Sequence, residues 1–297
     1  MKYLLIVNPH SGKKNSLNIL NQIKPIFNSN DIILEIIKTK YAGHAKNIAH
    51  EINLNNYDGL LAIGGDGTLN EIINGMLTRK DEKKVPLGLI PGGSGNSYLH
   101  DLKLTEPLIA TNAIIKNKTQ AMDVAKIEIE NKIQYSINMI GWGLVTDIGN
   151  KAEKYRWLGT SRYTMLSILE VFTYKSRPAT LMMEKKTIKD DFTFIIACNS
   201  IHVGNGMKMA PRAKLNDGLI DLIIVKSDVS KIRLLSTLPK LFDGTHINQA
   251  EVSYYQTPSF SLIPKNNDIL NIDGEIMGKT PITVKMIPEA IEFFINK

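Results

Sequence analysis

Cysteine is almost absent from this sequence, and no stretch of it is apolar for long enough to cross a bilayer. Cys198 is the one cysteine among 297 residues, so an internal disulfide framework and a cysteine zinc site are both excluded. The apolar start, MKYLLIVNPH, is too short for a signal peptide. These absences together predict a cytoplasmic protein.

The two commonest phosphate-binding motifs are missing as well. The segment SGKK lacks the upstream glycine and the following Ser or Thr of a Walker A loop, and neither GGDGTLNE nor GGSGNSY fits G-x-G-x-x-G. The sequence is therefore that of neither an ordinary P-loop enzyme nor an ordinary Rossmann dehydrogenase.

The composition is that of a folded protein with a surplus of positive charge. Hydrophobic residues make up 43% of the chain and charged residues 22%, and the formal net charge is +7. This surplus favours an anionic partner such as nucleotide phosphate or a membrane surface. Nucleic acid is disfavoured, because the basic residues are scattered and no RNA-binding motif is present.

The pattern of apolar runs changes near residue 120. Before it, short apolar runs alternate with helical patterns, which is typical of a doubly wound parallel sheet. After it, strand-like segments separated by Asn, Asp, Gly and Pro predict an antiparallel β-rich part. We therefore expect an α/β domain over residues 1–120 and a β-rich domain over 121–286, with residues 287–297 returning to the first domain.

Individual elements can be expected from the same patterns. The N-terminal strands are expected at 2–7, 32–38, 57–63 and 86–90. Helices are expected after Ser16 as a cap, over 43–53, over 68–79 and, as an interruption of the β-rich part, over 153–174.

Polar, glycine-rich segments follow three of the predicted strands, namely NPHSGKKN, GGDGT and PGGSGNSY. In a parallel sheet these segments leave the carboxyl ends of the strands, where α/β sheets bind ligands. The backbone amides of such loops can form a cradle for a polyphosphate. For any one segment, the alternative is a tight turn without a chemical role.

Asp66 stands in the middle loop, where a helix is expected to begin. Thr68 and Glu71 have the spacing of a capping box, which predicts that they satisfy the free amides at that helix start. An acidic side chain beside a phosphate repels it unless a cation intervenes. Asp66 is therefore expected to anchor Mg²⁺ or to act as a general base on a hydroxyl, the alternative being a turn residue with no chemical role.

Several segments together resemble one family of enzymes. VNPHSGK, GGDGTLNEIINGM and PGGSGNS are followed by GWGLVTDIGNKAEKYRWLGTSRYTM, LNDGLIDLIIV and DGE. In this order and spacing they are similar to the catalytic part of diacylglycerol kinases and sphingosine kinases. The resemblance covers nearly the whole chain, and its middle segment looks most like the sphingosine kinase branch. It implies an N-terminal α/β domain and a C-terminal antiparallel β-sandwich domain, with ATP in the cleft between them.

The three loops and the resemblance together predict the residues at the nucleotide. These are Asn8, Ser11, Gly12, Lys13, Thr39, Gly64, Gly65, Gly67, Thr68, Glu71, Gly92, Gly93, Ser94, Asn96, Arg156 and Arg162. The two arginines match residues that reach the ATP phosphates, and planar guanidinium groups are suited to neutralise charge during phosphoryl transfer. The alternative for both is ordinary surface charge.

Two aspartates compete for the role of catalytic base, Asp66 and Asp273. By itself, the DGE segment around Asp273 is most simply a hairpin turn, and LNDGLIDL is likewise a hairpin signal. The resemblance implies Glu275 as a Mg²⁺ ligand and a second, structural Mg²⁺ held by Asp217 and the carbonyl groups of Lys214 and Leu219.

The lipid-binding residues are implied less completely. Asp147 matches an acidic residue of sphingosine kinases, but the second acidic residue that they carry two places later is Gly149 here. Bacterial diacylglycerol kinases carry Asn-Asp in the third loop, where this chain has Asn96 and Ser97. A neutral lipid alcohol is therefore at least as well supported as sphingosine. Four apolar residues at helical spacing either line a slot for the lipid tail, form a lid or pack on the β-rich domain: Met165, Ile168, Leu169 and Phe172.

The expected activity is the transfer of phosphate from ATP to a lipid hydroxyl with the help of Mg²⁺. The lipid would be presented at a membrane surface, which the basic residues contact peripherally. An NAD kinase shares GGDGT but usually carries an Asn-Asn-Glu segment, which is not found here. A regulatory module that binds nucleotide without catalysis is a further alternative, against which the retained acidic residues and arginines argue. The acceptor lipid and a homodimer are left open.

Overall fold

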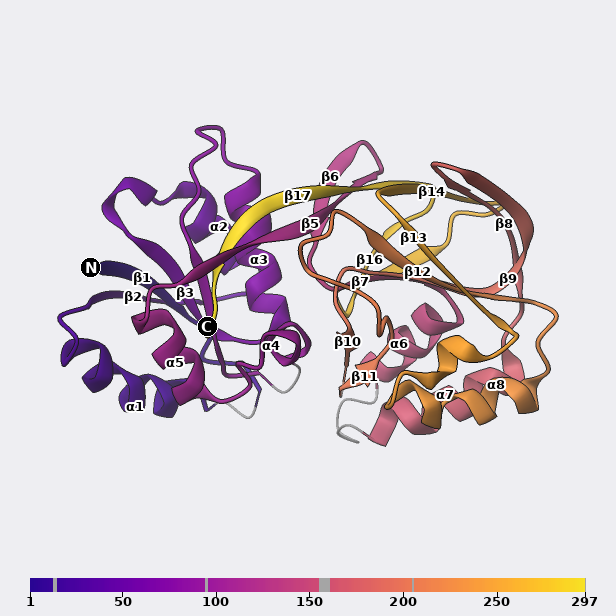
Figure 1. The fold of residues 1–297 in the computed structure, drawn as a ribbon, viewed down its shortest axis with the longest axis horizontal. Helices are drawn as coiled ribbons and strands as arrows, with labels where there is room; N and C mark the ends of the chain where they lie inside the picture. The colour runs from indigo at the N-terminus through magenta and orange to yellow at the C-terminus, as the bar shows by residue number, and fades with distance from the viewer. Residues whose placement is uncertain (13–14, 94–95, 155–160, 205, 297) are drawn as a thin grey trace. The chain divides into compact units, whose positions relative to one another are not determined.

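A computed structural model describes residues 1–12, 15–93, 96–154, 161–204 and 206–296. The chain forms two compact units (Figure 1). Unit 1 contains Met1–Asp123 and Glu289–Lys297, and unit 2 contains Val124–Pro288. Unit 1 is an α/β fold, and unit 2 is an antiparallel β-sandwich, which confirms the fold class expected from the sequence.

Unit 1 is built on a parallel sheet with the strand order β17-β4-β3-β1-β2. Its strands are β1 (Lys2–Val7), β2 (Ile33–Lys38), β3 (Gly59–Gly64), β4 (Leu87–Pro91) and the last residues of β17 (Ile282–Phe294). The residues of β3 and β4 are buried throughout. This follows from the sequence, because parallel strands covered on both faces are continuous apolar runs. The edge strand β2 is partly exposed.

Helices cover the sheet of unit 1 in two groups. They are α1 (Ser16–Asn28), α2 (His44–Glu51), α3 (Asp66–Leu77), α4 (Ser97–Leu102) and α5 (Pro107–Ile115). Helix α1 packs against α5, and α2 packs against α3 (Figure 1). The buried face of α1 includes Leu20, Ile23 and Phe27, as its periodicity predicts.

The expected cap of α1 is wrong. Ser16 is the first helical residue and Asn15 occupies the N-cap position. The Ser16 hydroxyl is buried and has no hydrogen-bond partner among the residues that the structure describes. Ser16 therefore packs on the sheet side of the helix instead of satisfying its free amides.

Unit 2 is built from antiparallel strands. They are β5 (Thr119–Ile129, which begins in unit 1), β6 (Lys132–Ser136), β7 (Met139–Gly143), β8 (Arg177–Met183), β9 (Lys186–Cys198), β10 (His202–Val203), β11 (Met207–Lys208), β12 (Ile220–Lys226), β13 (Val252–Thr257), β14 (Ser259–Pro264), β15 (Ile269–Ile272), β16 (Glu275–Lys279) and the first part of β17. Alternate residues of these strands form its main core, including Ile220, Leu222 and Ile224 of β12. Within the core, the rings of Trp142 and Phe192 meet edge to face, with centroids 6.3 Å apart.

The helices of unit 2 are α6 (Leu144–Lys154), α7 (Ser161–Thr173) and α8 (Lys231–Thr237). Helix α7 packs against α6 and α8 (Figure 1). The single helix expected over 153–174 is therefore wrong, because helix begins earlier, at Leu144, and α7 is a separate element. Among the described residues, the helices are all too short or too polar to span a membrane.

Candidate active site

Three loops meet at the carboxyl edge of the sheet in unit 1. The amide groups of Gly92 and Gly93 donate to the carbonyl oxygen of Gly64, at 2.7 and 3.1 Å, which joins the loop after β4 to the end of β3. The amide of Asn8 donates to the carbonyl oxygen of Ile63 at 3.0 Å, which joins the loop after β1 to the same strand. The structure therefore brings together the three glycine-rich segments that the sequence places at strand ends.

Glycine is required at two points where these loops touch. Gly12 has a φ of +55°, and a Cβ atom there would lie 2.6 Å from the carbonyl oxygen of Gly92. A Cβ atom on Gly93 would lie 2.7 Å from the Cα of Gly65. A side chain at either point would force the backbones apart. The glycines thus serve the close contact between loops, whatever ligand the loops bind.

Polar side chains hold the same edge. Asn8 Nδ2 donates to the hydroxyl of Thr68 at 3.1 Å, and Asn8 Oδ1 accepts from the amide of His10 at 3.0 Å. Asn96 Nδ2 donates to the carbonyl oxygen of Gly93 at 3.2 Å. Its Oδ1 is buried without a hydrogen-bond partner in the described part of the chain. A buried acceptor of this kind is usually satisfied by a ligand or water.

The capping box expected in α3 is wrong. The helix begins at Asp66, so Thr68 lies inside its first turn rather than at the N-cap. Glu71 does cap a helix, but it is the neighbouring α2. Its two carboxylate oxygens accept hydrogen bonds from the amides of Gly43 at 2.9 Å and Ala45 at 3.0 Å.

Asp66 also binds the start of a neighbouring helix. Its Oδ2 accepts from the amide of Ser97 at 2.8 Å, and its Oδ1 accepts from the amide of Tyr98 at 3.2 Å. These are the first two residues of α4, which follows the third loop. A carboxylate at this position satisfies free amides and interacts favourably with the helix dipole. Asp66 therefore ties the second loop to the third.

Some predicted residues cannot be placed. Lys13, Ser94 and Arg156 lie outside the described residues, and Arg162 lies in α7 with its side chain outside them. Thr39 follows β2, and its amide donates to the carbonyl oxygen of Val7 at 2.8 Å. Gly67 lies in the first turn of α3.

Asp273 of unit 2 forms a hairpin turn with Gly274 between β15 and β16. Both residues have positive φ values, 51° and 90°, which is the pattern of a type I′ turn. The carboxylate accepts hydrogen bonds from the Ser136 hydroxyl at 2.7 Å and from the amides of Ile137, Asn138 and Met139, each at 2.9 Å. Burial raises the pKa of this carboxyl group, and the hydrogen bonds oppose the rise.

The residues expected at metal ions lie in unit 2 as well. Glu275 is exposed at the start of β16. Asp217 Oδ1 accepts from the amide of Leu219 at 3.1 Å in a turn where Gly218 has a φ of +74°. In the part of the chain that the structure describes, His, Cys, Asp and Glu side chains do not gather in threes around a metal-sized site. The set of one carboxylate and two carbonyl groups thus stays a prediction.

Asp147 of α6 has a partner that the sequence did not reveal. Arg177 Nη2 lies 2.9 and 2.8 Å from its two carboxylate oxygens. Arg177 Nε also lies 3.9 Å from Asp268 Oδ1, and the other oxygen of Asp268 accepts from the buried Trp142 Nε1 at 3.1 Å. An unpaired carboxylate in a mostly apolar segment was the signal that a cation should lie nearby. No local sequence pattern indicates that this cation is Arg177, which lies 30 residues further along the chain.

Helix α7 exposes the apolar residues that the sequence assigns to the lipid. Met165, Ile168, Leu169 and Phe172 are between 43% and 58% exposed, whereas Val171 is buried against α8 and the sheet. The alternative that this stripe packs on the β-sandwich is therefore wrong. An apolar stripe this long, left open on one helix, is more than the scattered apolar residues of an ordinary surface.

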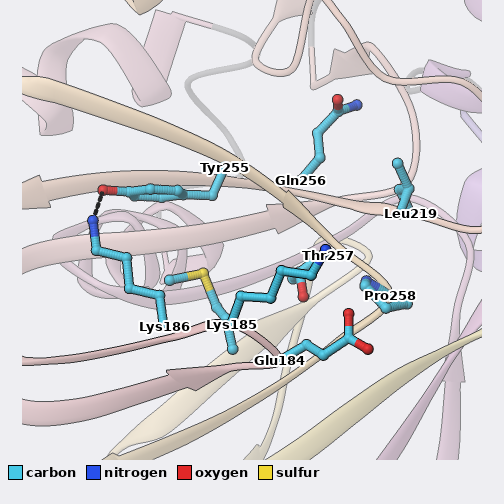
Figure 2. Close-up of a pocket in the computed structure, with 9 residues that line it drawn as sticks. Glu184, Lys185, Lys186, Leu219, Tyr255, Gln256, Thr257 and Pro258 are labelled. Carbon is cyan, nitrogen blue, oxygen red and sulfur yellow. Dashed lines mark hydrogen bonds between the residues drawn. The ribbon is translucent and has the colours of Figure 1, made fainter.

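A cavity of about 330 Å³ lies elsewhere in unit 2, beside the β8–β9 hairpin (Figure 2). Its lining includes Lys185, Lys186, Tyr255 and Gln256, and Lys186 Nζ donates to the Tyr255 hydroxyl at 2.8 Å. Figure 2 shows the Lys186 ammonium group at the Tyr255 hydroxyl and the Lys185 side chain extending in another direction. Leu219 is the one residue it shares with the predicted set.

Comparison with known proteins defines the class. The family model of the diacylglycerol kinase catalytic domain matches residues 2–127, and that of the YegS C-terminal NAD kinase beta sandwich-like domain matches residues 138–295. The chain therefore belongs to the lipid kinases that carry this catalytic domain, and it is an ATP-dependent lipid kinase. This confirms the resemblance stated from the sequence.

Particular relatives narrow the comparison. The chain is similar to sphingosine kinase 1 of Arabidopsis thaliana, with 33% identity over 94% of this chain and 69% of that protein. Sphingosine kinase 2 of the same plant is 30% identical over 98% of this chain and 72% of its own length. The fold is similar to the crystal structure of a putative diacylglycerol kinase from Bacillus anthracis, with a TM-score of 0.83, 24% identity and coverage of 99% and 95%. An NAD kinase from Archaeoglobus fulgidus shares the fold at a TM-score of 0.53 and 13% identity, over 99% of this chain and 94% of that one.

Proposed function

We propose that the loops at the carboxyl edge of unit 1 bind the phosphates of ATP. The observation that carries this proposal is the set of hydrogen bonds that holds the three loops together, from Gly92 and Gly93 to Gly64 and from Asp66 to the start of α4. These bonds bring the three loops to one edge, and the backbone amides of loops that converge in this way favour anionic oxygen atoms. Arg156 and Arg162 would add guanidinium groups to the same phosphates.

The proposed function also includes the binding of Mg²⁺. Asp217 with the carbonyl groups of Lys214 and Leu219 would supply oxygen ligands, which Mg²⁺ prefers. The chemistry of this donor set fits the ion. One further observation agrees with it: the buried Asp221 has a carboxylate oxygen without a partner among the described residues. Burial is the main cause that raises the pKa of Asp221, and the negative charge of Asp217 adds to the rise. This ion would be structural, whereas Glu275 would bind a second Mg²⁺, which would neutralise negative charge on the phosphates.

We assign Asp66 the role of orienting the acceptor hydroxyl and a structural role to Asp273. Asp66 lies at the phosphate edge and accepts hydrogen bonds from two backbone amides, and a carboxylate can accept from more than two donors, so it can also accept from a hydroxyl group. The Asp273 carboxylate accepts hydrogen bonds from four donors, which lie in and beside the turn between β6 and β7. Its geometry favours the hairpin-turn interpretation over that of a base.

The first candidate for the acceptor lipid is a sphingoid base. Two sphingosine kinases match at 30–33% identity over nearly the whole chain. The exposed apolar stripe of α7 would contact the lipid tail, either as part of a slot or against a membrane surface.

The second candidate is a neutral lipid alcohol such as a diacylglycerol. It is favoured by the ion pair between Asp147 and Arg177, because both carboxylate oxygens already face a guanidinium group. A cationic lipid amine at Asp147 would have to compete with Arg177, and Gly149 supplies no second carboxylate. A neutral head group meets no such competition.

A kinase assay with labelled ATP across sphingosine, ceramide, diacylglycerol, monoacylglycerol and undecaprenol tests both candidates, with the products identified by mass. Arg177→Gln should raise the ratio of kcat/KM for sphingosine over diacylglycerol by about tenfold, because the freed carboxylate is worth about 1.4 kcal/mol to a cation. Lys151→Gln is the matched control, since it breaks a different ion pair, with Glu170. An unchanged ratio in Arg177→Gln would remove the ion pair as a determinant of selectivity. Failure of all lipids would contradict the proposed function.

A further inference from the structure

Tyr41 is an aromatic residue held rigidly in solvent. It lies in the loop between β2 and α2 and is 58% exposed. One face of its ring stacks on His44, with centroids 4.7 Å apart and planes 26° apart. Asn47 Nδ2 donates to the Tyr41 hydroxyl at 3.3 Å, and His44 Nδ1 accepts from the amide of Lys40 at 3.1 Å. Because His44 covers one face, the exposed area lies mainly on the opposite face and the edge of the ring.

The loop that carries Tyr41 is joined to the proposed phosphate edge on two sides. On one side, the amide of Thr39 donates to Val7, the residue directly before Asn8. On the other side, Glu71 of α3 binds the amides of Gly43 and Ala45, and α3 is the helix that begins in the GGDG loop. Tyr41 therefore belongs to the same edge of unit 1 as the glycine-rich loops.

We propose that the exposed face of Tyr41 stacks on the base of the nucleotide whose phosphates lie against these loops. The inference rests on the proposed function and adds the residue that recognises the nucleoside end of the ligand. Backbone amides can bind phosphate, but they leave the apolar faces of a purine in water. A ring fixed before binding loses little conformational freedom when a base stacks on it.

The details of Tyr41 fit this role better than a role for its hydroxyl. The hydroxyl group already accepts a hydrogen bond from Asn47, so the ring face is the part that remains available. Stacking on an aromatic ring tolerates any base, because every base has a π face. The site should therefore bind GTP with an affinity similar to that for ATP.

Two comparisons test the inference, one between Tyr41 and its variants and one between a ligand with a base and a ligand without one. The dissociation constants of ATP and of inorganic tripolyphosphate, which has no base, are measured without lipid for the wild type, Tyr41→Ala and Tyr41→Phe. Tyr41→Ala should bind ATP about tenfold more weakly, the range expected for base stacking, and tripolyphosphate as tightly as the wild type does. Tyr41→Phe should bind both ligands as the wild type does. Ile33→Ala, which changes an exposed apolar side chain at the opposite end of β2, is the control.

Each other outcome has a definite meaning. Equal binding of ATP by the wild type and Tyr41→Ala would overturn the inference and leave the proposed function standing. An equal loss for ATP and tripolyphosphate would also overturn it, because it would indicate damage to the loop. If the wild type bound neither ligand, the proposed function would fail with it. Tyr41→Leu keeps the apolar bulk without a π face, and it should reproduce the loss if the alanine variant is unstable.

Discussion

Replacing Asp66 with alanine should destabilise unit 1 as well as stop lipid phosphorylation. The carboxylate accepts hydrogen bonds from the amides of Ser97 and Tyr98, and these residues are only 4% and 0% exposed. Water therefore cannot easily replace the lost acceptor. Leaving a buried amide without a partner costs about 1–3 kcal/mol, and loss of a helix cap costs about 0.5–2 kcal/mol. The two amides together predict a loss of about 2–4 kcal/mol in the free energy of unfolding.

Asp66→Asn separates the structural role from the chemical one. Its side chain keeps one acceptor oxygen but no charge, so about half of the loss is expected. If Asp66 also orients the acceptor hydroxyl, this variant should lose turnover far more than stability. Urea unfolding measures the free energy of unfolding, and hydrogen exchange measures the protection of the two α4 amides. The labelled-ATP assay measures turnover. Ser230→Ala is the control, because Ser230 caps α8 with a hydroxyl at 3.3 Å and is not among the predicted site residues.

Two results would refute parts of this reasoning. Full activity in Asp66→Ala would exclude a chemical role for the carboxylate. An unchanged free energy of unfolding, to within about 0.5 kcal/mol, would show that the bonds to α4 add nothing to stability.

Two further predictions concern unit 2. Burial lowers the pKa of His246, so its folded-state value lies below the unfolded value of about 6.5. Its contribution to stability is complete above that pH and is lost as the pH falls, by up to about 1.4 kcal/mol per pH unit. Urea unfolding from pH 8 to 5 should show this decline, and His246→Gln should lack it; equal slopes would contradict the reasoning. Phe172→Glu should raise the KM for lipid in vesicles about tenfold and leave the KM for ATP unchanged, whereas Ile33→Glu should change neither. A normal lipid KM in Phe172→Glu would exclude contact between this face and the lipid.

The elements that the sequence predicts best are those whose own residues determine them. The runs KYLLIV, GLLAIG and LGLIP are apolar on both faces, which is why they could be assigned to a covered parallel sheet. Helix α6 could not be recognised in this way. It contains Gly149, and near its start it carries the β-branched residues Val145 and Thr146, which are poorer helix formers than Ala or Leu. It is held by packing against α7 and β7.

Side-chain partners far apart in the sequence could not be predicted. Thr68 and Glu71 have the spacing of a capping box, but in the structure the Glu71 side chain accepts hydrogen bonds from amides at the start of another helix, α2. Asp147 and Arg177 are likewise joined only by the fold. Spacing rules describe contacts within one helix or turn, and these contacts cross between elements. The positions of the glycine-rich loops were predictable from strand order, whereas the hydrogen bonds between them were not.

Helix α3 explains why one edge of unit 1 is held so firmly. Asp66 and Glu71 are five residues apart, and at 3.6 residues per turn their side chains point in directions about 140° apart around the helix axis. One carboxylate can therefore reach α4 while the other reaches α2. Because both neighbours begin in loops at the carboxyl edge, a single helix fixes the third glycine-rich loop and the loop that carries Tyr41. A shift of α3 would move the proposed phosphate and base contacts together, so the two parts of a nucleotide site would keep their spacing.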